Sequence, residues 1–288
     1  MLGLDPDPAC LWPQSLERSE WDLARLPGAA YRAAAAVTGH CRIVIEAVSD
    51  LCVAVKLQVA CFERLGAPGW AALIRSAGAA RERGLIVIAD AKRGDIDVSA
   101  AAYAQAFFGD TATPFGEVEG VGADALTVNP LLGSDAVAPL LSEARPRGAG
   151  LFVLVRTSNP GAAEVQDLEL AAGGTVSERL AAMVRRLGEP GVGEAGLSDV
   201  GAVVGATVPA HVASLRAQMP HTIFLLPGVG AQGGAVEDLA AAFAPGRAGG
   251  LVSASRSIVY AHERHGGDPA DAARREASRL RELAWSLS

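Results

Sequence analysis

Residues 87–96 read VIADAKRGDI, an apolar run that ends in four charged side chains within six positions. An apolar run without strict alternation is typical of a strand buried on both faces, as in a parallel sheet. Asp90 and Lys92 are two positions apart, so they share a face if the strand continues through them. Gly94 lets the chain turn towards the next helix. The segment predicts a buried parallel strand whose carboxyl end carries charged groups for a site.

Short apolar runs followed by helix-like segments repeat along the chain on either side of this segment. Expected strands cover residues 2–4, 51–55, 85–89, 123–128, 150–155, 201–205, 222–226 and 249–253. Expected helices cover residues 16–37, 70–83, 98–107, 135–144, 176–187, 209–218, 236–243 and 269–287. Residues 109–122 and 160–175 are expected to be loops. Eight βα alternations predict an α/β fold, a single (β/α)₈ TIM barrel. An open dinucleotide-binding sheet would need G-x-G-x-x-G after its first strand, where this chain has LGLDPDP.

The composition limits the classes of protein to which the chain can belong. The chain has 288 residues, 50% hydrophobic and 20% charged, with a net charge of −7, so it can bury a large core. The acidic balance argues against non-specific nucleic-acid binding. The apolar runs are too short to span a bilayer, and the N-terminus lacks the features of a signal peptide. The four cysteines have no metal spacing and are interpreted as free thiols. These features predict a soluble, cytoplasmic protein in one domain over residues 1–288, and the early first strand leaves open a natural start upstream of Met1.

Lysine is almost absent from the sequence. Of 25 basic residues only Lys56 and Lys92 are lysines, and both fall at expected strand ends. Arginine keeps its charge and is planar, whereas lysine is a compact charge that can release a proton. Two lysines kept at one end of a barrel therefore indicate places where an ammonium group has a task.

Other polar residues follow the expected strands in the same way. They are Asp5, Asp90, Thr127, Asn129, Arg156, Thr157, Ser158, Asn159 and Thr207. Strand seven is followed by PGVGAQGG (residues 227–234), whose backbone N–H groups could face an anion, and strand eight by SASRSI, which contains Arg256. Because barrels commonly bind phosphate after these two strands, the sequence predicts a phosphate site there.

Taken together, LGLDP, strand-end Lys56, DAKRGDI, LTVNPLLGSDA, FVLVRTSNPGA and PGVGAQGG resemble the orotidine 5′-phosphate decarboxylases, in their longer bacterial branch. The resemblance runs from Leu2 to about Ile258. It implies decarboxylation of orotidine 5′-phosphate to UMP without a cofactor or metal, in pyrimidine nucleotide synthesis.

The resemblance also implies roles for individual residues. Lys56, Asp90, Lys92 and Asp95 match the family's alternating Lys–Asp–Lys–Asp array, with Lys92 as the proton donor to C6 of the pyrimidine. The implied substrate-binding residues are Asp5 for the ribose, Ser158 for the pyrimidine edge, Gln232 and Arg256 for the phosphate, and also Thr127 and Ser99. Ser99 replaces the threonine that is usual in the family. The family further implies a homodimer in which Asp95 completes the partner's site.

Two other functions remain open from the sequence. A Mg²⁺-dependent sugar-phosphate decarboxylase or aldolase of the same suprafamily also has D-x-K-x-x-D, but has an acidic residue where this chain has Lys56. A non-catalytic nucleotide-binding barrel would not need all four charged members of the array.

Overall fold

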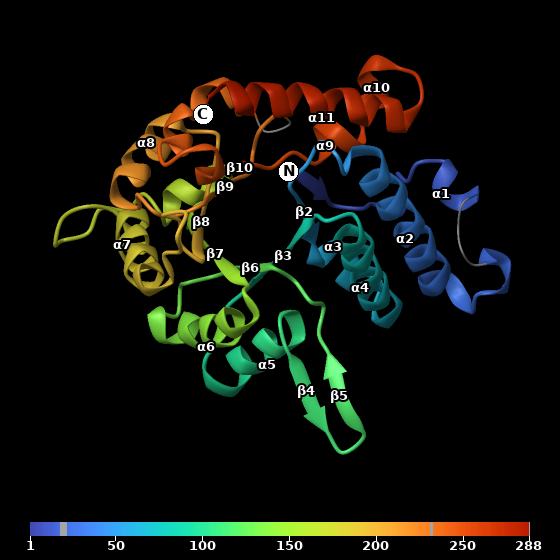
Figure 1. Cartoon of the computed structure of the whole chain (residues 1–288), viewed down its shortest axis with the longest axis horizontal. Coiled ribbons are helices and arrows are strands. Elements are labelled where there is room, and N and C mark those ends of the chain that lie inside the picture. Colours follow the sequence, from blue (N-terminus) through green and yellow to red (C-terminus); the bar gives the residue numbers. More distant parts are fainter. Residues whose placement is uncertain (18–21, 231–232, 288) are drawn as a thin grey trace. The chain divides into compact units, whose positions relative to one another are not determined.

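The computed structural model describes residues 1–17, 22–230 and 233–287 (Figure 1). The chain divides into two compact units. Unit 1 comprises Met1–Ala91, Val121–Ala123 and Ser255–Arg281. Unit 2 comprises Lys92–Gly120, Asp124–Ala254 and Glu282–Ser288. The boundary between Ala91 and Lys92 falls inside the DAKRGDI motif.

Unit 1 contains the first three strands, which run parallel in the order β1-β2-β3. Lys56 pairs with Gly3 on β1 and with Ile88 on β3, and two positions further along β2 Gln58 pairs with Asp90. The strands are β1 (Leu2–Leu4), β2 (Ala54–Gln58) and β3 (Ile86–Arg93), the last two residues of which belong to unit 2. The helices are α1 (Gln14–Glu17), η1 (Leu23–Arg25), α2 (Gly28–Val48), α3 (Val59–Glu63), α4 (Ala67–Glu82), α9 (Arg256–Val259), α10 (Ala261–His265) and α11 (Pro269–Ser286), whose residues from Glu282 onward belong to unit 2.

Unit 2 continues the same alternation, with parallel strands in the order β6-β7-β8-β9-β10. The strands are β6 (Ala125–Val128), β7 (Gly150–Arg156), β8 (Val200–Val204), β9 (Phe224–Leu226) and β10 (Gly250–Val252). The helices are α5 (Asp97–Phe107), α6 (Ser134–Ala144), η2 (Arg145–Arg147), η3 (Pro160–Glu164), α7 (Val176–Gly188), η4 (Glu189–Gly191), α8 (Pro209–Gln218), η5 (Val236–Phe243) and η6 (Arg247–Gly249).

The eight parallel strands in the described residues occur in the order of a (β/α)₈ barrel, so the predicted fold class is confirmed. All eight expected strands are present, but β2 begins three residues later than predicted and β3 extends four residues further. Lys56, Asp90 and Lys92 therefore lie within strands rather than just after them. The four cysteines are free thiols, as expected.

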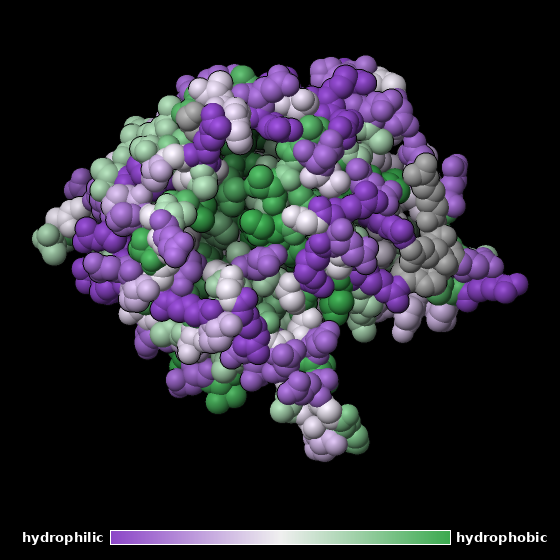
Figure 2. Space-filling model, viewed as in Figure 1, coloured by the Kyte–Doolittle hydropathy of each residue, from purple (hydrophilic) through white to green (hydrophobic). Residues whose placement is uncertain are grey.

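One predicted loop is wrong. Residues 109–122 contain an antiparallel hairpin of β4 (Asp110–Thr113) and β5 (Gly116–Glu119), seen at the lower edge of Figure 1. The sequence does not predict this hairpin, because almost none of it is buried and its Gly, Pro, Thr and Glu residues form no apolar alternation. Its tip is open to solvent, with Phe115 99% exposed, and the surface of the projecting hairpin is pale to green at its end in Figure 2.

A buried arginine holds together several loops of unit 2. Arg216 donates hydrogen bonds to the carbonyl oxygens of Met219, Thr222, Ala242 and Gly249 at 2.7–2.9 Å. Its guanidinium lies 3.7 Å from the ring centroid of Phe224, a cation–π contact. Burial lowers the pKa of Arg216 to about 10. One planar guanidinium thus supplies the hydrogen-bond donors for four main-chain carbonyl groups.

Unit 1 contains a buried histidine beside a fully buried tryptophan. His40 is 1% exposed, and its Nδ1 accepts the backbone N–H of Trp12 at 3.1 Å. The Trp12 indole N–H donates to the Val259 carbonyl at 2.9 Å, so α9 is tied to the same cluster. Burial, assisted by the nearby His262, lowers the pKa of His40 to about 4. His40 is therefore neutral in the folded chain at neutral pH.

Among the described residues, no helix combines the length and the apolar character needed to cross a membrane.

We predict a loss of stability in mild acid that originates at His40. Its folded pKa lies below the unfolded value of 6.5, so the unfolded chain binds the proton more readily. The free energy of unfolding should fall by about 2 kcal/mol between pH 7 and pH 5, measured by urea unfolding. In His40→Gln, whose side-chain oxygen can still accept from Trp12, that part of the pH dependence should disappear. Equal pH dependence in parent and variant would contradict the assignment.

Candidate active site

Unit 1 buries a lysine and an aspartate together on β2 and β3. Lys56 and Asp90 are each 6% exposed, and Lys56 Nζ donates to Asp90 Oδ2 at 2.7 Å. Asp5, which follows β1, places Oδ1 3.8 Å from the same ammonium. Gln58 Nε2 donates to Asp90 Oδ2 at 3.2 Å. Three predicted site residues from three neighbouring strands thus form one charged cluster.

The electrostatics of Lys56 follow from this arrangement. Burial by itself would lower the pKa of Lys56, but the negative charges of Asp90 and Asp5 and the hydrogen bond to Asp90 raise it above its usual value. Lys56 is therefore an ammonium in a nearly dry place. Removing either member of such a pair leaves an uncompensated charge, which costs about 3–5 kcal/mol.

In unit 2 the backbone at Lys92 is strained. Lys92 has φ of +50° and Asp97 has φ of +45°, and no other non-glycine residue in the described ranges has positive φ. For a side chain other than glycine this conformation costs about 1–2 kcal/mol. Such strain persists only where the surroundings fix it, and it is concentrated at functional sites.

Strand β6 supplies the contacts that fix this turn. The Lys92 N–H donates to Thr127 Oγ1 at 2.9 Å, and the Asn129 N–H donates to the Arg93 carbonyl at 2.7 Å. A Cβ on Gly94 would lie 2.7 Å from the Asn129 carbonyl oxygen, so only glycine lets the two segments approach. Thr127 is 1% exposed, and its hydroxyl contacts the main chain of Lys92.

The rest of the motif is held against α5. The Arg93 guanidinium lies 5.3 Å from the ring centroid of Tyr103 and 5.9 Å from that of Phe107. Asp95 Oδ1 accepts the N–H of Ile96 at 2.8 Å, and Ser99 is exposed in the first turn of α5. These contacts orient the segment between Lys92 and the helix.

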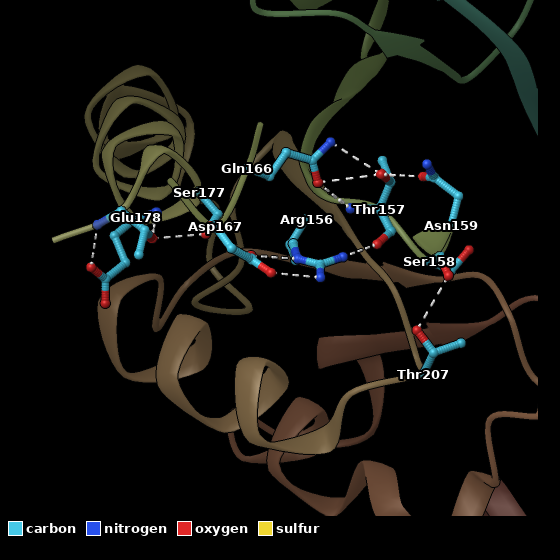
Figure 3. Close-up of polar contacts among 10 residues, drawn as sticks. Arg156, Thr157, Ser158, Asn159, Gln166, Asp167, Ser177, Glu178 and Thr207 are labelled. Atoms are coloured by element: carbon cyan, nitrogen blue, oxygen red, sulfur yellow. Dashed lines mark hydrogen bonds and ion pairs between the residues drawn. The ribbon is translucent and has the colours of Figure 1, made fainter. Parts of the chain in front are cut away.

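At the end of β7, Ser158 lies close to the end of β8 (Figure 3). Its carbonyl oxygen accepts the Thr207 hydroxyl at 3.4 Å. A Cβ on Gly205 would lie 2.7 Å from the Ser158 Cα, so this approach also requires glycine. Ser158 and Thr207, which the sequence placed at neighbouring strand ends, are brought together.

The predicted phosphate elements lie in different units. In the loop after β9, the N–H groups of Gly230, Gly233 and Gly234 donate to carbonyls within the loop, so these three groups do not face an anion as expected. Gln232 lies outside the described residues. Arg256, in unit 1, is exposed at the start of α9, and its side chain has no hydrogen-bond acceptor in the described part of the chain.

Sequence reasoning missed Gln58 as a part of the candidate site, and it placed Asn129 at a strand end without a role. Gln58 lies two residues after Lys56 on the same strand, so strand alternation places it on the lysine's face and could have indicated it. Asn129 acts through its backbone, for which the sequence carries no signal. Within the described residues, no three His, Cys, Asp or Glu side chains are grouped so as to hold a metal ion.

Comparison with known proteins shows the family of this chain. The profile of the orotidine 5′-phosphate decarboxylase / HUMPS family matches residues 35–275. The orotidine 5′-phosphate decarboxylase of Deinococcus radiodurans is 46% identical over 253 residues, which are 88% of this chain and 86% of that protein. This chain belongs to the orotidine 5′-phosphate decarboxylase family. The family resemblance of its motifs is therefore confirmed.

Solved structures of orotidine 5′-phosphate decarboxylase relatives share the fold. The OMP decarboxylase of Leishmania donovani is 30% identical with a TM-score of 0.69, covering 99% of this chain and 92% of that one. UMP synthase of the same organism is 31% identical with a TM-score of 0.71, covering 98% of this chain. The present chain spans 53% of the length of that synthase.

We predict that the Thr127 hydroxyl matters more for stability than its methyl group. Thr127→Val keeps the volume but leaves the Lys92 N–H without its acceptor, which should lower the free energy of unfolding by about 1–3 kcal/mol. Thr127→Ser keeps the hydroxyl and should be the more stable of the two in urea unfolding. If packing alone decided stability, the valine variant would be the more stable, because serine loses a buried methyl group. A valine variant as stable as the parent would refute the role of this hydrogen bond.

Proposed function

We propose that this protein decarboxylates orotidine 5′-phosphate to UMP, without a cofactor, as a step of pyrimidine nucleotide synthesis. The proposal is carried by the buried pair of Lys56 on β2 and Asp90 on β3, the strand that continues into Lys92, in a chain 46% identical to a decarboxylase of that name. Lys56, Asp90, Lys92 and Asp95 would form the catalytic charge array.

The proposed chemistry centres on Lys92. Breaking the bond between C6 and the carboxylate releases CO₂ and leaves an electron pair at C6, with no cofactor to accept it. The Lys92 ammonium stabilises that charge and then transfers a proton from Nζ to C6. Asp90 acts beside the departing carboxylate, where it disfavours the charged ground state. Most of the rate enhancement comes from charges fixed in place before the reaction.

The remaining residues bind the parts of the substrate that do not react. Asp5 and Lys56 take the ribose hydroxyls, Ser158 the pyrimidine edge, and Arg256 with Gln232 the phosphate, with Thr127 and Ser99 completing the binding set. Binding energy from the phosphate can lower the barrier at C6, because it is used to orient and distort a remote part of the substrate.

Two other functions are less well supported. A Mg²⁺-dependent sugar-phosphate enzyme needs an acidic ligand at the place of Lys56, and this ammonium would repel the cation. A non-catalytic nucleotide-binding barrel gives no reason to keep a buried charge pair beside a strained lysine.

We further propose that residues 1–288 form one domain, that the protein acts in the cytoplasm and that it is a homodimer that does not bind nucleic acid. The dimer is supported by apolar side chains near Asp95: Ile96 is 50% exposed and Val98 is 83% exposed. Two-fold dimers are the commonest closed assemblies, and they make any sharing of residues reciprocal.

The function is tested by following the loss of orotidine 5′-phosphate by absorbance in excess EDTA. The parent should turn over in EDTA, whereas a strict requirement for Mg²⁺ would reject the proposal. Lys92→Arg should be folded and nearly inactive, because arginine keeps the charge but does not readily release a proton. If this variant keeps more than about a tenth of kcat/KM, a cost below about 1.4 kcal/mol, Lys92 is not the proton donor.

Shared sites are tested by mixing two inactive variants. Lys92→Ala and Asp95→Ala homodimers should each be nearly inactive. A mixed dimer places both lesions in one site and leaves the other intact. Unfolding and refolding the two together should therefore recover about a quarter of parental activity, since half the dimers are mixed and each has one working site. If nothing is recovered although both variants refold as dimers, Asp95 acts within its own chain.

A further inference from the structure

The segment between β7 and α7 is tied down by four side chains that the proposed chemistry does not use. Arg156, Thr157, Gln166 and Asp167, here called the clasp, are joined by hydrogen bonds on both sides of Ser158 and Asn159 (Figure 3). All four belong to unit 2. This connection is a long one, with only the 3₁₀ turn η3 inside it, so its order depends on such contacts.

Arg156 is the fixed side of the clasp. It ends β7, is 7% exposed, and donates from Nε and Nη2 to the two oxygens of Asp167 at 2.7 and 2.9 Å. Its Nη1 donates to the Thr157 carbonyl at 2.5 Å. A planar fork that meets a carboxylate with two bonds fixes orientation as well as distance.

Gln166 closes the clasp one residue away. Its Oε1 accepts the Thr157 N–H at 2.8 Å, and its Nε2 donates to Thr157 Oγ1 at 3.1 Å. The Thr157 hydroxyl donates to Asn159 Oδ1 at 2.7 Å. The peptide groups that flank Thr157 are thus held by two side chains, one from the far end of the loop (Gln166) and one from the end of β7 (Arg156).

The opposite side of the same segment rests on the end of β8. The Gly205 N–H donates to the Arg156 carbonyl at 2.7 Å, and Thr207 contacts the Ser158 carbonyl. Ser158 is therefore fixed from β8 on one side and from the clasp on the other. Its own side chain appears in none of the hydrogen bonds described for the clasp.

The charge state of the clasp is settled at neutral pH. The hydrogen bond from Arg156 lowers the pKa of Asp167, and the positive charge of Arg156 and the nearby His211 act in the same direction. Asp167 is therefore ionised. In an Asp167→Asn variant the amide would turn an N–H₂ group towards the guanidinium and lose one of the two bonds.

We propose that Asp167 and Arg156 are positioning residues for recognition of the pyrimidine base, acting by fixing the main chain at Thr157–Ser158. The inference rests on the proposed function, in which Ser158 meets the pyrimidine edge. It assigns no contact between Asp167 and the substrate. The clasp sets the affinity for the base and leaves the affinity for the ribose phosphate unchanged.

The test compares two ligands that differ by the base. Calorimetry gives Kd for UMP and for ribose 5-phosphate with the parent and with Asp167→Asn. We expect Kd for UMP to rise about tenfold, equivalent to about 1.4 kcal/mol, and Kd for ribose 5-phosphate to change less than about twofold. Asp167→Glu, which can still accept two bonds from Arg156, should recover most of the UMP affinity.

A matched control is available in the same unit. Arg145 donates to both oxygens of Asp199 at 2.6 and 3.2 Å, and Asp199 directly precedes β8, at the end opposite to Ser158 and Thr207. Asp199→Asn breaks a pair of the same kind and should leave both dissociation constants unchanged. If Asp199→Asn raises Kd for UMP as much as Asp167→Asn does, the proposal is overturned.

The remaining outcomes also decide the matter. If Asp167→Asn weakens the binding of both ligands equally, or of neither ligand, the positioning role of the clasp is overturned. If that variant does not fold by circular dichroism, Gln166→Met removes the contacts with Thr157 and must show the same split between ligands, or the clasp is rejected. A parent that neither binds UMP nor consumes orotidine 5′-phosphate rejects the proposed function itself, whereas an active parent with an unaffected Asp167→Asn rejects the clasp alone.

Discussion

The hydrogen bond between Lys56 and Asp90 places two opposite charges where the surrounding strands are otherwise apolar. Val55, Leu57 and Ala89, their neighbours along β2 and β3, are fully buried. Neither charge would be stable there alone, because burial of an unpaired ion costs more than the chain can offset elsewhere. The register that pairs Lys56 with Ile88 and Gln58 with Asp90 leaves the Lys56 ammonium within hydrogen-bond distance of Asp90. The register of the first strands therefore has to keep the two charges together as well as pair the backbones.

A second constraint acts on the main chain. Lys92 adopts a left-handed conformation that a lysine does not favour, and the hydroxyl of Thr127 on β6 and the N–H of Asn129 just after β6 hold the turn. The same device recurs at β7 and β8, where Gly205 and Thr207 hold the chain at Ser158. In both places the main chain of the residue proposed to meet the substrate is held by the backbone or hydroxyl of a neighbouring segment, so its position is set before a ligand binds.

Much of this was readable from the sequence, and the failures have physical causes. Apolar runs gave all eight strands, because strands buried on both faces have a composition that little else in the chain shares. The start of β2 was misplaced because Leu51 and Cys52 are as apolar as the strand that follows. The hairpin at Asp110–Glu119 was missed because an exposed ribbon needs no apolar pattern. Strand-end position identified Lys56, Asp90 and Thr127. It could not identify Asp167, which comes from the middle of a loop, or show that the Thr127 hydroxyl contacts the backbone of Lys92.

The scarcity of lysine has a practical consequence for reagents that acylate amines. Lys56 is buried and ion-paired, so its side chain is shielded from such reagents in the folded chain. Lys92 is the exposed lysine of the two. Apart from the α-amino group, a mild amine-directed probe would therefore address one defined lysine on the native protein. Protection of that position by a ligand would report occupancy of the site directly, and the arginine-rich remainder of the surface would stay silent.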